Sequence, residues 1–261
     1  MGYVGMKIKT IKRFARIIAL VLLAGSLSGC MYWVRAYQTY LQMDEFDRYF
    51  SVVSADDFTL QFKKPILYSK DFVLLSRLYA SEDNLTQEGR RWRYWFRKID
   101  ANNHLIAPEI SFYSDLNFNK EGLLTAWSFS SLFLKIAPPK FLEVSLRSIG
   151  GAKIDKEKQQ LRANTELLTK ISDQLPKKAS VIAQLGEPLE ITDEGDMEVY
   201  MYHFLLDTHH IEKGYEDRAL NEIKIRFDKK TDELIGMSGR FAGLKVSIDY
   251  RNFLNAPSKE L

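Results

Sequence analysis

The sequence predicts an α+β fold in which one unit, with helices packed on one face of an antiparallel sheet, occurs twice in tandem. Residues 92–96 (WRYWF) and 200–204 (YMYHF) both place an aromatic side chain at every second position, which is the period of a half-buried strand. Apolar residues at helical spacing precede each segment. Short polar turns follow, which favours antiparallel meanders over parallel crossovers.

The two halves share further segments in the same order. A second strand-like segment ends in Phe118-Asn119 in the first half and in Phe227-Asp228 in the second, and a polar turn follows each. The other matches are Leu74, Leu75 and Leu78 with Val181, Ile182 and Leu185; Leu134-Lys135-Ile136 with Leu244-Lys245-Val246; and Phe141-Leu142 with Phe253-Leu254. Because such matches in one order are not expected by chance, we predict two copies of one unit.

Local signals place the helices of each copy. The segment from Trp33 to Phe50 is predicted to be helical ahead of the first copy. In the first copy, Ser69 or Asp71 can cap a helix that carries its three leucines on one face. In the second copy, residues 178–185 form the corresponding helix, which Gly186-Glu187-Pro188 ends.

A further helix is predicted between the copies. Gly150-Gly151 interrupts the chain, and apolar residues then recur at spacings of seven, seven, three and four. These residues are Ile154, Leu161, Leu168, Ile171 and Leu175. The spacing predicts an amphipathic helix that packs on the second sheet or crosses between the two sheets.

Alternation along residues 90–98 predicts a basic and aromatic outer face on the first sheet. Trp92, Tyr94 and Phe96 point one way, whereas Arg93, Trp95 and Arg97 point the other way. Interleaved cations and aromatics can bind nucleic acid, or form the solvated side of an ordinary strand. Exposed Trp and Arg also dominate protein interfaces. We predict that Arg93, Trp95 and Arg97 bind a protein partner or anionic lipid headgroups.

The first thirty residues have the layout of a secretory leader. A basic stretch precedes the apolar run 17–27, which is too short to span a bilayer. Leu27, Ser28, Gly29 and Cys30 resemble a bacterial lipobox, in which the leader is cut before the cysteine and the thiol is acylated. Cys30 is the only cysteine of the chain and has no disulfide partner. We therefore expect a membrane anchor through lipid on Cys30.

The charge of the processed chain argues against nucleic acid as a partner. The whole chain has 37 basic and 34 acidic residues, but five of the basic residues and none of the acidic ones lie in residues 1–29. Removal of the leader leaves a net charge of about −2, whereas nucleic-acid-binding domains are strongly basic. A hydrophobic content of 46% and an aromatic content of 13% indicate a folded, well-packed body.

Candidate chemical sites are few. His203, His209, His210 and Glu212 lie within ten residues and have zinc-ligand chemistry, but His203 alternates with core aromatics and the other two histidines fall in a predicted loop. Asp193, Glu194 and Asp196 crowd a loop without the spacing of a calcium site. Nucleophile, metalloprotease and phosphate-binding motifs are missing from the sequence. We expect no catalytic residue, no metal and no cofactor.

The second copy resembles a family of small lipoproteins. A helix that ends in Leu185-Gly186-Glu187-Pro188, an aromatic strand 200–204 and a strand that closes on Phe227-Asp228 are similar to the SmpA/OmlA (BamE-like) lipoproteins. That resemblance implies two helices packed on a three-stranded sheet, and the lipobox agrees with it. The first copy has Leu78-Tyr79 where the Leu-Gly-x-Pro turn would be. The tandem layout resembles that of the beta-lactamase inhibitory protein.

The resemblance implies a protein-binding role, because members of these families bind other proteins and are not enzymes. We expect a leader at residues 1–29, a lipidated tether and helix at 30–57, repeats at 58–151 and 152–256, and a tail at 257–261. The expected protein is a non-catalytic envelope lipoprotein with a role in envelope assembly or maintenance. Met31 after the cysteine favours the outer membrane, facing the periplasm, by resemblance to lipoprotein sorting in Gram-negative bacteria.

Two other classes of function stay open. A carrier or sensor would hold an apolar ligand between sheet and helices, in a cavity lined by Tyr94, Phe118 and Trp127. An enzyme would need polar groups that converge in a cleft, and the sequence places none together.

Overall fold

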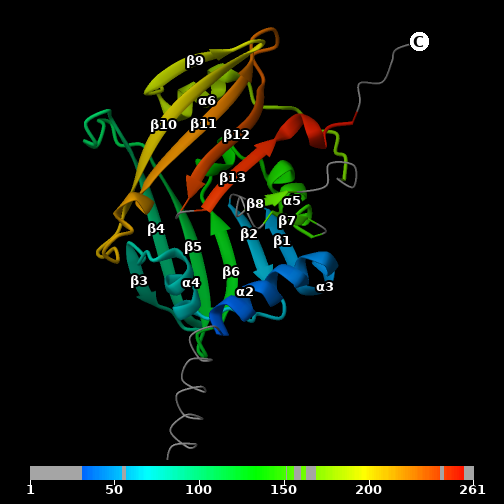
Figure 1. Ribbon diagram of the computed structural model, residues 1–261, viewed down its shortest axis with the longest axis vertical. Helices are drawn as coiled ribbons and strands as arrows, with labels where there is room; N and C mark the ends of the chain where they lie inside the picture. Colours follow the sequence, from blue (N-terminus) through cyan, green and yellow to red (C-terminus); the bar gives the residue numbers. More distant parts are fainter. Residues whose placement is uncertain are drawn as a thin grey trace, which may run out of the picture.

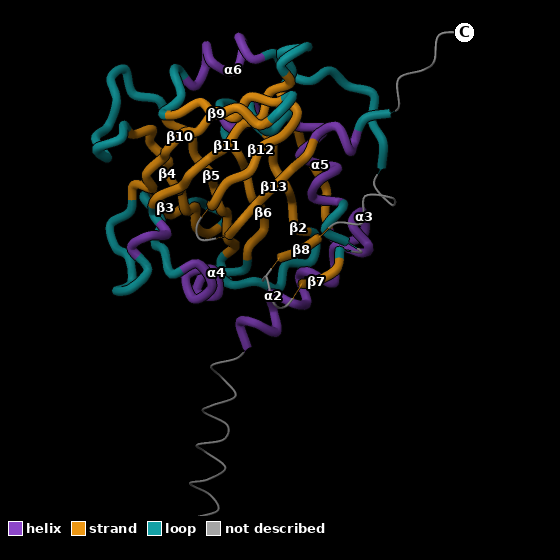
Figure 2. Tube along the Cα trace, turned by 45° about the horizontal axis from the view of Figure 1, so that its top comes forward, coloured by secondary structure: helices purple, strands orange, loops and turns teal. Residues whose placement is uncertain are grey.

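The computed structural model describes residues 31–54, 57–150, 152–155, 160–162, 169–241 and 244–255, and it belongs to the α+β class that the sequence predicts. Within these ranges eleven strands form one antiparallel sheet, and two more form a separate hairpin. Figure 1 shows that the sheet curls, and Figure 2 shows helices α4 and α6 at opposite ends of it.

The first half of the described chain runs from a helical segment into six strands of the sheet and then into the hairpin. Its elements are α2 (Met31–Gln42), η1 (Met43–Glu45), α3 (Phe46–Tyr49), β1 (Phe50–Ser54), β2 (Phe58–Phe62), α4 (Ser69–Ser76), β3 (Glu82–Leu85), β4 (Gly89–Ile99), β5 (Ser111–Asn119), β6 (Leu124–Phe129), η2 (Phe133–Lys135), α5 (Pro139–Arg147), β7 (Lys153–Asp155) and β8 (Gln160–Arg162). The N-terminal helical segment is thus confirmed up to residue 49, and β1 begins at Phe50, the last residue of the predicted helix.

The second half begins with a helix and continues through the remaining strands. Its elements are α6 (Lys178–Leu185), β9 (Glu190–Glu194), β10 (Met197–Asp207), η4 (Glu216–Arg218), β11 (Leu220–Asp228), β12 (Leu234–Phe241), β13 (Leu244–Asp249) and η5 (Tyr250–Phe253). Helix α6 has the predicted limits. It ends at Gly186, whose φ of +66° lies in the left-handed region that glycine adopts without a steric cost.

The strands of both halves belong to one sheet, in the order β1-β2-β6-β5-β4-β10-β11-β12-β13. The two long central strands, β4 and β10, each pair with two different strands along the edge at which the halves meet. The first part of β4 pairs with β3 and its last part with β10; likewise, the first part of β10 pairs with β9 and its last part with β4. Where β4 meets β10, Arg97 lies opposite Leu205.

Period-two alternation places the core on one side of β4 and β10, as predicted. Tyr94 and Phe96 are buried, and so are Tyr202 and Phe204 on β10. Helix α5 completes the core between the two ends of the curled sheet. It contacts η5 through the rings of Phe141 and Tyr250, 5.2 Å apart, and contacts α3 through an ion pair between Arg147 and Asp47.

The predicted amphipathic helix between the halves is wrong. Residues 153–155 and 160–162 form the β7–β8 hairpin, and residues 169–177 are not helical. Residues 163–168, and Leu168 with them, lie outside the described residues. A seven-residue spacing does not distinguish a helix from two strands that each contribute one apolar residue. Pro176 also disfavours a helical conformation at Leu175, which is buried without being helical.

Two of the predicted matches between the halves are also wrong. Leu134-Lys135-Ile136 begins in the 3₁₀ helix η2, whereas Leu244-Lys245-Val246 lies in strand β13. On α4 the three leucines do not share a buried face. Leu74 is 37% exposed, and Leu78, which is buried, lies beyond the end of the helix. Spacing alone therefore predicted the position of this helix correctly, but it did not predict which side of the helix is buried.

Each half caps a helix of the other half with a cation. The Lys98 ammonium on β4 donates hydrogen bonds to the carbonyls of Leu185 and Glu187 at the end of α6, both at 2.6 Å. The Arg218 guanidinium donates to the carbonyls of Leu75 and Ser76 at the end of α4, at 3.2 and 2.8 Å. Cations suit these positions because the last carbonyls of a helix lack intrahelical donors and carry partial negative charge.

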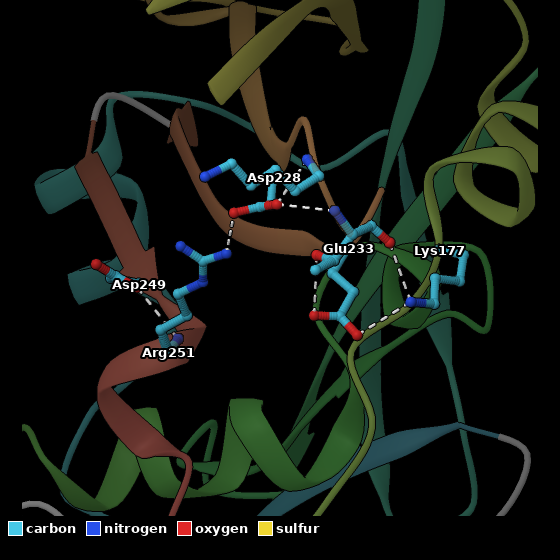
Figure 3. A network of polar contacts seen from close by, with 7 residues as sticks. Lys177, Asp228, Glu233, Asp249 and Arg251 are labelled. Carbon is cyan, nitrogen blue, oxygen red and sulfur yellow. Dashed lines mark hydrogen bonds and ion pairs between the residues drawn. The ribbon is translucent and has the colours of Figure 1, made fainter. Parts of the chain in front are cut away.

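A second polar network ties the end of β11 to the C-terminal segment (Figure 3). Asp228 accepts hydrogen bonds from the backbone N–H groups of Lys230 and Thr231, at 2.8 and 2.9 Å, and its other oxygen accepts from Arg251. The Arg251 hydrogen bond, followed by the backbone donors, holds the pKa of Asp228 below its usual range. Beside it, Lys177 donates to Glu233 at 3.0 Å, which joins the residue before α6 to the start of β12.

Replacement of Lys98 tests the capping between the halves. Burial lowers the pKa of this ammonium, but its hydrogen bonds satisfy two carbonyls that Lys98→Ala would leave without a donor. We expect a loss of about 2 kcal/mol in the free energy of unfolding, measured by urea titration. Lys120→Ala, in an exposed turn, is the control. Equal midpoints for both variants would contradict the role of Lys98.

The depressed pKa of Asp228 predicts a pH dependence of stability. A carboxylate with a lower pKa in the folded state than in the unfolded state stabilises the fold above its ordinary pKa of about 4, and this contribution is lost as the pH falls below that value. The urea midpoint should therefore drop less between pH 6 and pH 3 in Asp228→Asn than in the wild type. Parallel pH profiles for the two proteins would refute the assignment.

Candidate protein-binding face

The predicted partner-binding residues lie together on one face of the sheet. Arg91, Arg93, Trp95 and Arg97 of β4 point away from the core and are all partly buried. We call the surface formed by these side chains and their cross-strand neighbours the open face. Its neighbours are Asn117, Asp115 and Tyr113 on β5 and Leu205 and Asp207 on β10.

Arg93 is fixed within this face by a paired hydrogen bond. Its Nε and Nη2 donate to the two oxygens of Asp115, directly opposite on β5, both at 2.7 Å. Its guanidinium also lies over the ring of Tyr113, 3.7 Å from the centroid. The hydrogen bond to Asp115 raises the pKa of Arg93. Because both groups are mostly buried, this geometry is rigid, and the Arg93 charge is already neutralised.

Trp95 is held in place without being enclosed. Its indole Nε1 donates to Glu82 at 2.7 Å, and its ring meets that of Tyr113 edge-on with 5.1 Å between the centroids. The indole hydrogen bond lowers the pKa of Glu82. An aromatic ring that is fixed in this way loses little conformational freedom when a partner covers it.

Arg97 lies where the two halves meet. It donates to Glu109 at 3.0 and 3.1 Å and to Asp207 of the second half at 3.0 Å. Leu205, its neighbour on β10, is 36% exposed. The open face therefore continues across the boundary between the halves, where the exposed Leu205 lies beside the ion-paired Arg97.

Arg91 differs from the other cations of the open face. Among the described residues it has no hydrogen bond or ion pair to another side chain; its Nε, like that of Arg97, is buried without an acceptor. It lines a broad depression of about 700 Å³ together with Gln61, Asn117 and Thr125 from three neighbouring strands and Glu88 from the β3–β4 turn. A buried donor without an acceptor is costly. This depression is therefore suited to an incoming acceptor such as a carboxylate.

Sequence reasoning found the three predicted residues but missed their partners and Arg91. Asp115, Tyr113 and Glu82 are scattered along the chain, and only the strand register brings them to β4. Arg91 lies two residues before Arg93, so the alternation along β4 places both on the same face. The turn at residues 120–122 joins β5 to β6, so counting back from it pairs Asp115 with Ser128 and does not give the register between β4 and β5.

The corresponding positions of β10 carry a thioether and an imidazole in place of the guanidinium and indole groups of β4. Met201 and His203 point to the same face as Arg93 and Trp95, and His203 lies 3.8 Å from Glu222. His209 and His210 are exposed in the loop after β10, as expected. Asp193 and Glu194 lie in strand β9 rather than in a loop. In the described part of the chain, no three His, Cys, Asp or Glu side chains gather as metal ligands would.

The residues expected to line an apolar cavity belong to the packed side of the sheet. Tyr94 is 4% and Phe118 2% exposed, and Phe118 packs edge-on against Trp92 at 4.9 Å. Trp127 is partly buried and packs against Phe129 at 4.8 Å. The hydroxyl of Tyr94 has no hydrogen-bond partner among the described residues, and burial raises its pKa.

Leu27, Ser28, Gly29 and Cys30 of the predicted lipobox lie outside the described residues. No helix that the structure describes combines the length and the hydropathy required to cross a bilayer. Comparisons of the chain with models of known families, with curated proteins and with solved structures found no match in any of the three.

Proposed function

We propose that this protein is a non-catalytic, protein-binding lipoprotein of the cell envelope, anchored by lipid on Cys30 to the outer membrane and facing the periplasm. The leader, the lipobox and the single cysteine support the anchor. Its proposed partner is an envelope protein rather than a nucleic acid, because the processed chain is slightly acidic.

The observation that carries the binding role is the composition of the open face. It combines a fixed Trp95 and the exposed Leu205 with the unsatisfied Arg91. Arg91 and Trp95 are four residues apart along β4, about 13 Å. A partner segment with one carboxylate and one apolar side chain at that separation could satisfy Arg91 and cover Trp95. Buried aromatic and arginine anchors provide most of the binding energy at protein interfaces.

We further propose that the two halves are tandem copies of one unit, related to the BamE-like lipoproteins and to the beta-lactamase inhibitory protein. Matched hydrogen bonds support the duplication. Ser69 donates to Gly122 before β6, and Lys178 donates to Asp232 before β12. A register irregularity also interrupts the pairing just before Phe118 on β5 and just before Phe227 on β11.

The pairing between β4 and β10 supports the same proposal. If Trp92 corresponds to Tyr200, as the aromatic pattern predicts, Arg97 corresponds to Leu205. These two residues face one another, and the neighbouring pairs are symmetric about them: Lys98 faces Phe204 and Phe96 faces Leu206. Such a register is what two identical units related by a two-fold axis would form.

Cross-linked capture from intact envelopes tests the binding role. We compare the wild type with Arg91→Glu and with Trp95→Ala, and expect at least about tenfold less captured partner for each, because each removes a proposed anchor. Neither substitution breaks an ion pair. The matched control is Met201→Ala with His203→Ala, at the positions of β10 that correspond to Arg93 and Trp95.

Equal urea midpoints would establish that the variants are folded. Undiminished capture by Arg91→Glu and Trp95→Ala, and by the stronger combination Arg93→Glu with Trp95→Ala, would refute the open face as the binding surface. A loss of capture confined to the control would also refute it, because the binding residues would then lie in the second half.

The anchor has a separate test. Cells that express the wild type should incorporate labelled palmitate into the protein, and mass spectrometry should find a processed N-terminus at an acylated Cys30. Cys30→Ala should abolish both the label and the cleavage, because the thiol is the acceptor. An unmodified thiol on a processed wild-type chain would disprove lipidation.

A further inference from the structure

Helix α2 packs with its polar side inward. Its buried residues are Thr39 and Gln42, whereas Trp33 is 61%, Tyr37 54% and Leu41 45% exposed. An ordinary surface helix has the opposite arrangement, with apolar side chains toward the core and polar ones toward water. The orientation of α2 therefore requires an explanation.

Specific hydrogen bonds hold the polar side in place. Arg35 donates from Nε and Nη2 to the two oxygens of Asp71, which is fully buried on α4. Gln42 donates to the carbonyl of Lys64 at 3.1 Å, and the hydroxyl of Tyr40 donates to the carbonyl of Ala152 at 2.7 Å. Rotation of α2 about its axis would break these bonds and leave Asp71 buried without its cation. The apolar side is thus fixed outward.

The outward side forms one continuous apolar stripe. Trp33, Tyr37 and Leu41 follow one another at intervals of four, so they lie along one side of the helix over about 12 Å. Val34, 43% exposed, lies beside them on the same side. Most other exposed apolar residues of the described chain are isolated, such as Leu85 on β3 and Ile191 on β9. A contiguous exposed apolar surface of this kind marks an interaction site.

We infer that α2 lies in the interfacial region of a lipid bilayer, with the stripe of Trp33, Val34, Tyr37 and Leu41 among the headgroups and upper acyl chains. Tryptophan and tyrosine prefer this region because their rings are apolar and their N–H and O–H groups need polar neighbours. The stripe carries no charge, and Asp44 and Glu45 of η1, just after α2, are exposed and keep that end in water.

The position of α2 in the chain favours a bilayer over a protein as the occupant. The helix begins at Met31, directly after the cysteine that we propose to be acylated, so the acyl chains would hold it at the membrane surface. This inference rests on the proposed anchor. A single weak membrane signal gives reversible binding, and two signals together give stable anchoring. The helix would add a second contact and fix which side of the protein faces the lipid.

The test uses the processed chain, residues 30–261, with Cys30→Ser so that no acyl chain contributes. We expect it to sediment with neutral phosphatidylcholine vesicles and its tryptophan emission to shift to the blue. The variant Trp33→Ala, Tyr37→Ala, Leu41→Ala should bind at least about tenfold more weakly, because it loses most of the apolar area that enters the lipid. The matched control is Leu85→Ala, Leu105→Ala, Ile191→Ala, three exposed apolar positions elsewhere, which should bind like its parent.

The outcomes separate this inference from the proposed function. If the parent does not bind vesicles, or if the control variant loses as much binding as the α2 variant, the inference is overturned. It is also overturned if the α2 variant binds vesicles normally but loses its protein partner, because the stripe would then be a protein contact. Since the assay needs no acylation, none of these results bears on lipid at Cys30 in cells.

Discussion

Strands β4 and β10 pair along residues 95–99 and 203–207, and this pairing makes a single sheet of the two halves. The rest of the architecture follows from it. The open face is continuous because Arg97 reaches Asp207 across the boundary. Helices α4 and α6 end against the opposite half because Lys98 and Arg218 reach over the same boundary. The core is likewise shared, since Phe112 of the first half packs against Phe204 of the second.

The sequence predicted the elements that have a strong period and missed those defined by tertiary contacts. The aromatic alternation placed β4 and β10 correctly, and Gly186 marked the end of α6. The segments that follow β6 and β12 could not be predicted. Their sequences are similar, Leu134-Lys135-Ile136 and Leu244-Lys245-Val246, but the first begins in η2 and the second lies in β13. Arg77 at the end of α4 has a positive φ, as Gly186 has at the end of α6, and its side chain gave no sign of this.

The candidate site was predicted only in part for a related reason. Alternation along β4 identified which of its side chains share a face, so Arg93, Trp95 and Arg97 were found together. Which cation is already neutralised depends on cross-strand neighbours more than ten residues away, such as Asp115 for Arg93. Arg91 stands out only once these pairs are known. The polar inward side of α2 depends on Asp71 in the same way.

The symmetric register about Arg97 and Leu205 has a consequence for a chain reduced to one half. Separated from its neighbour, β4 would present the unpaired N–H and C=O groups of its last five residues as a free edge. A second β4 in the same antiparallel register would satisfy those groups equally well, so an isolated half is expected to self-associate. Covalent fusion of the halves replaces that intermolecular contact with an internal one and makes assembly independent of protein concentration.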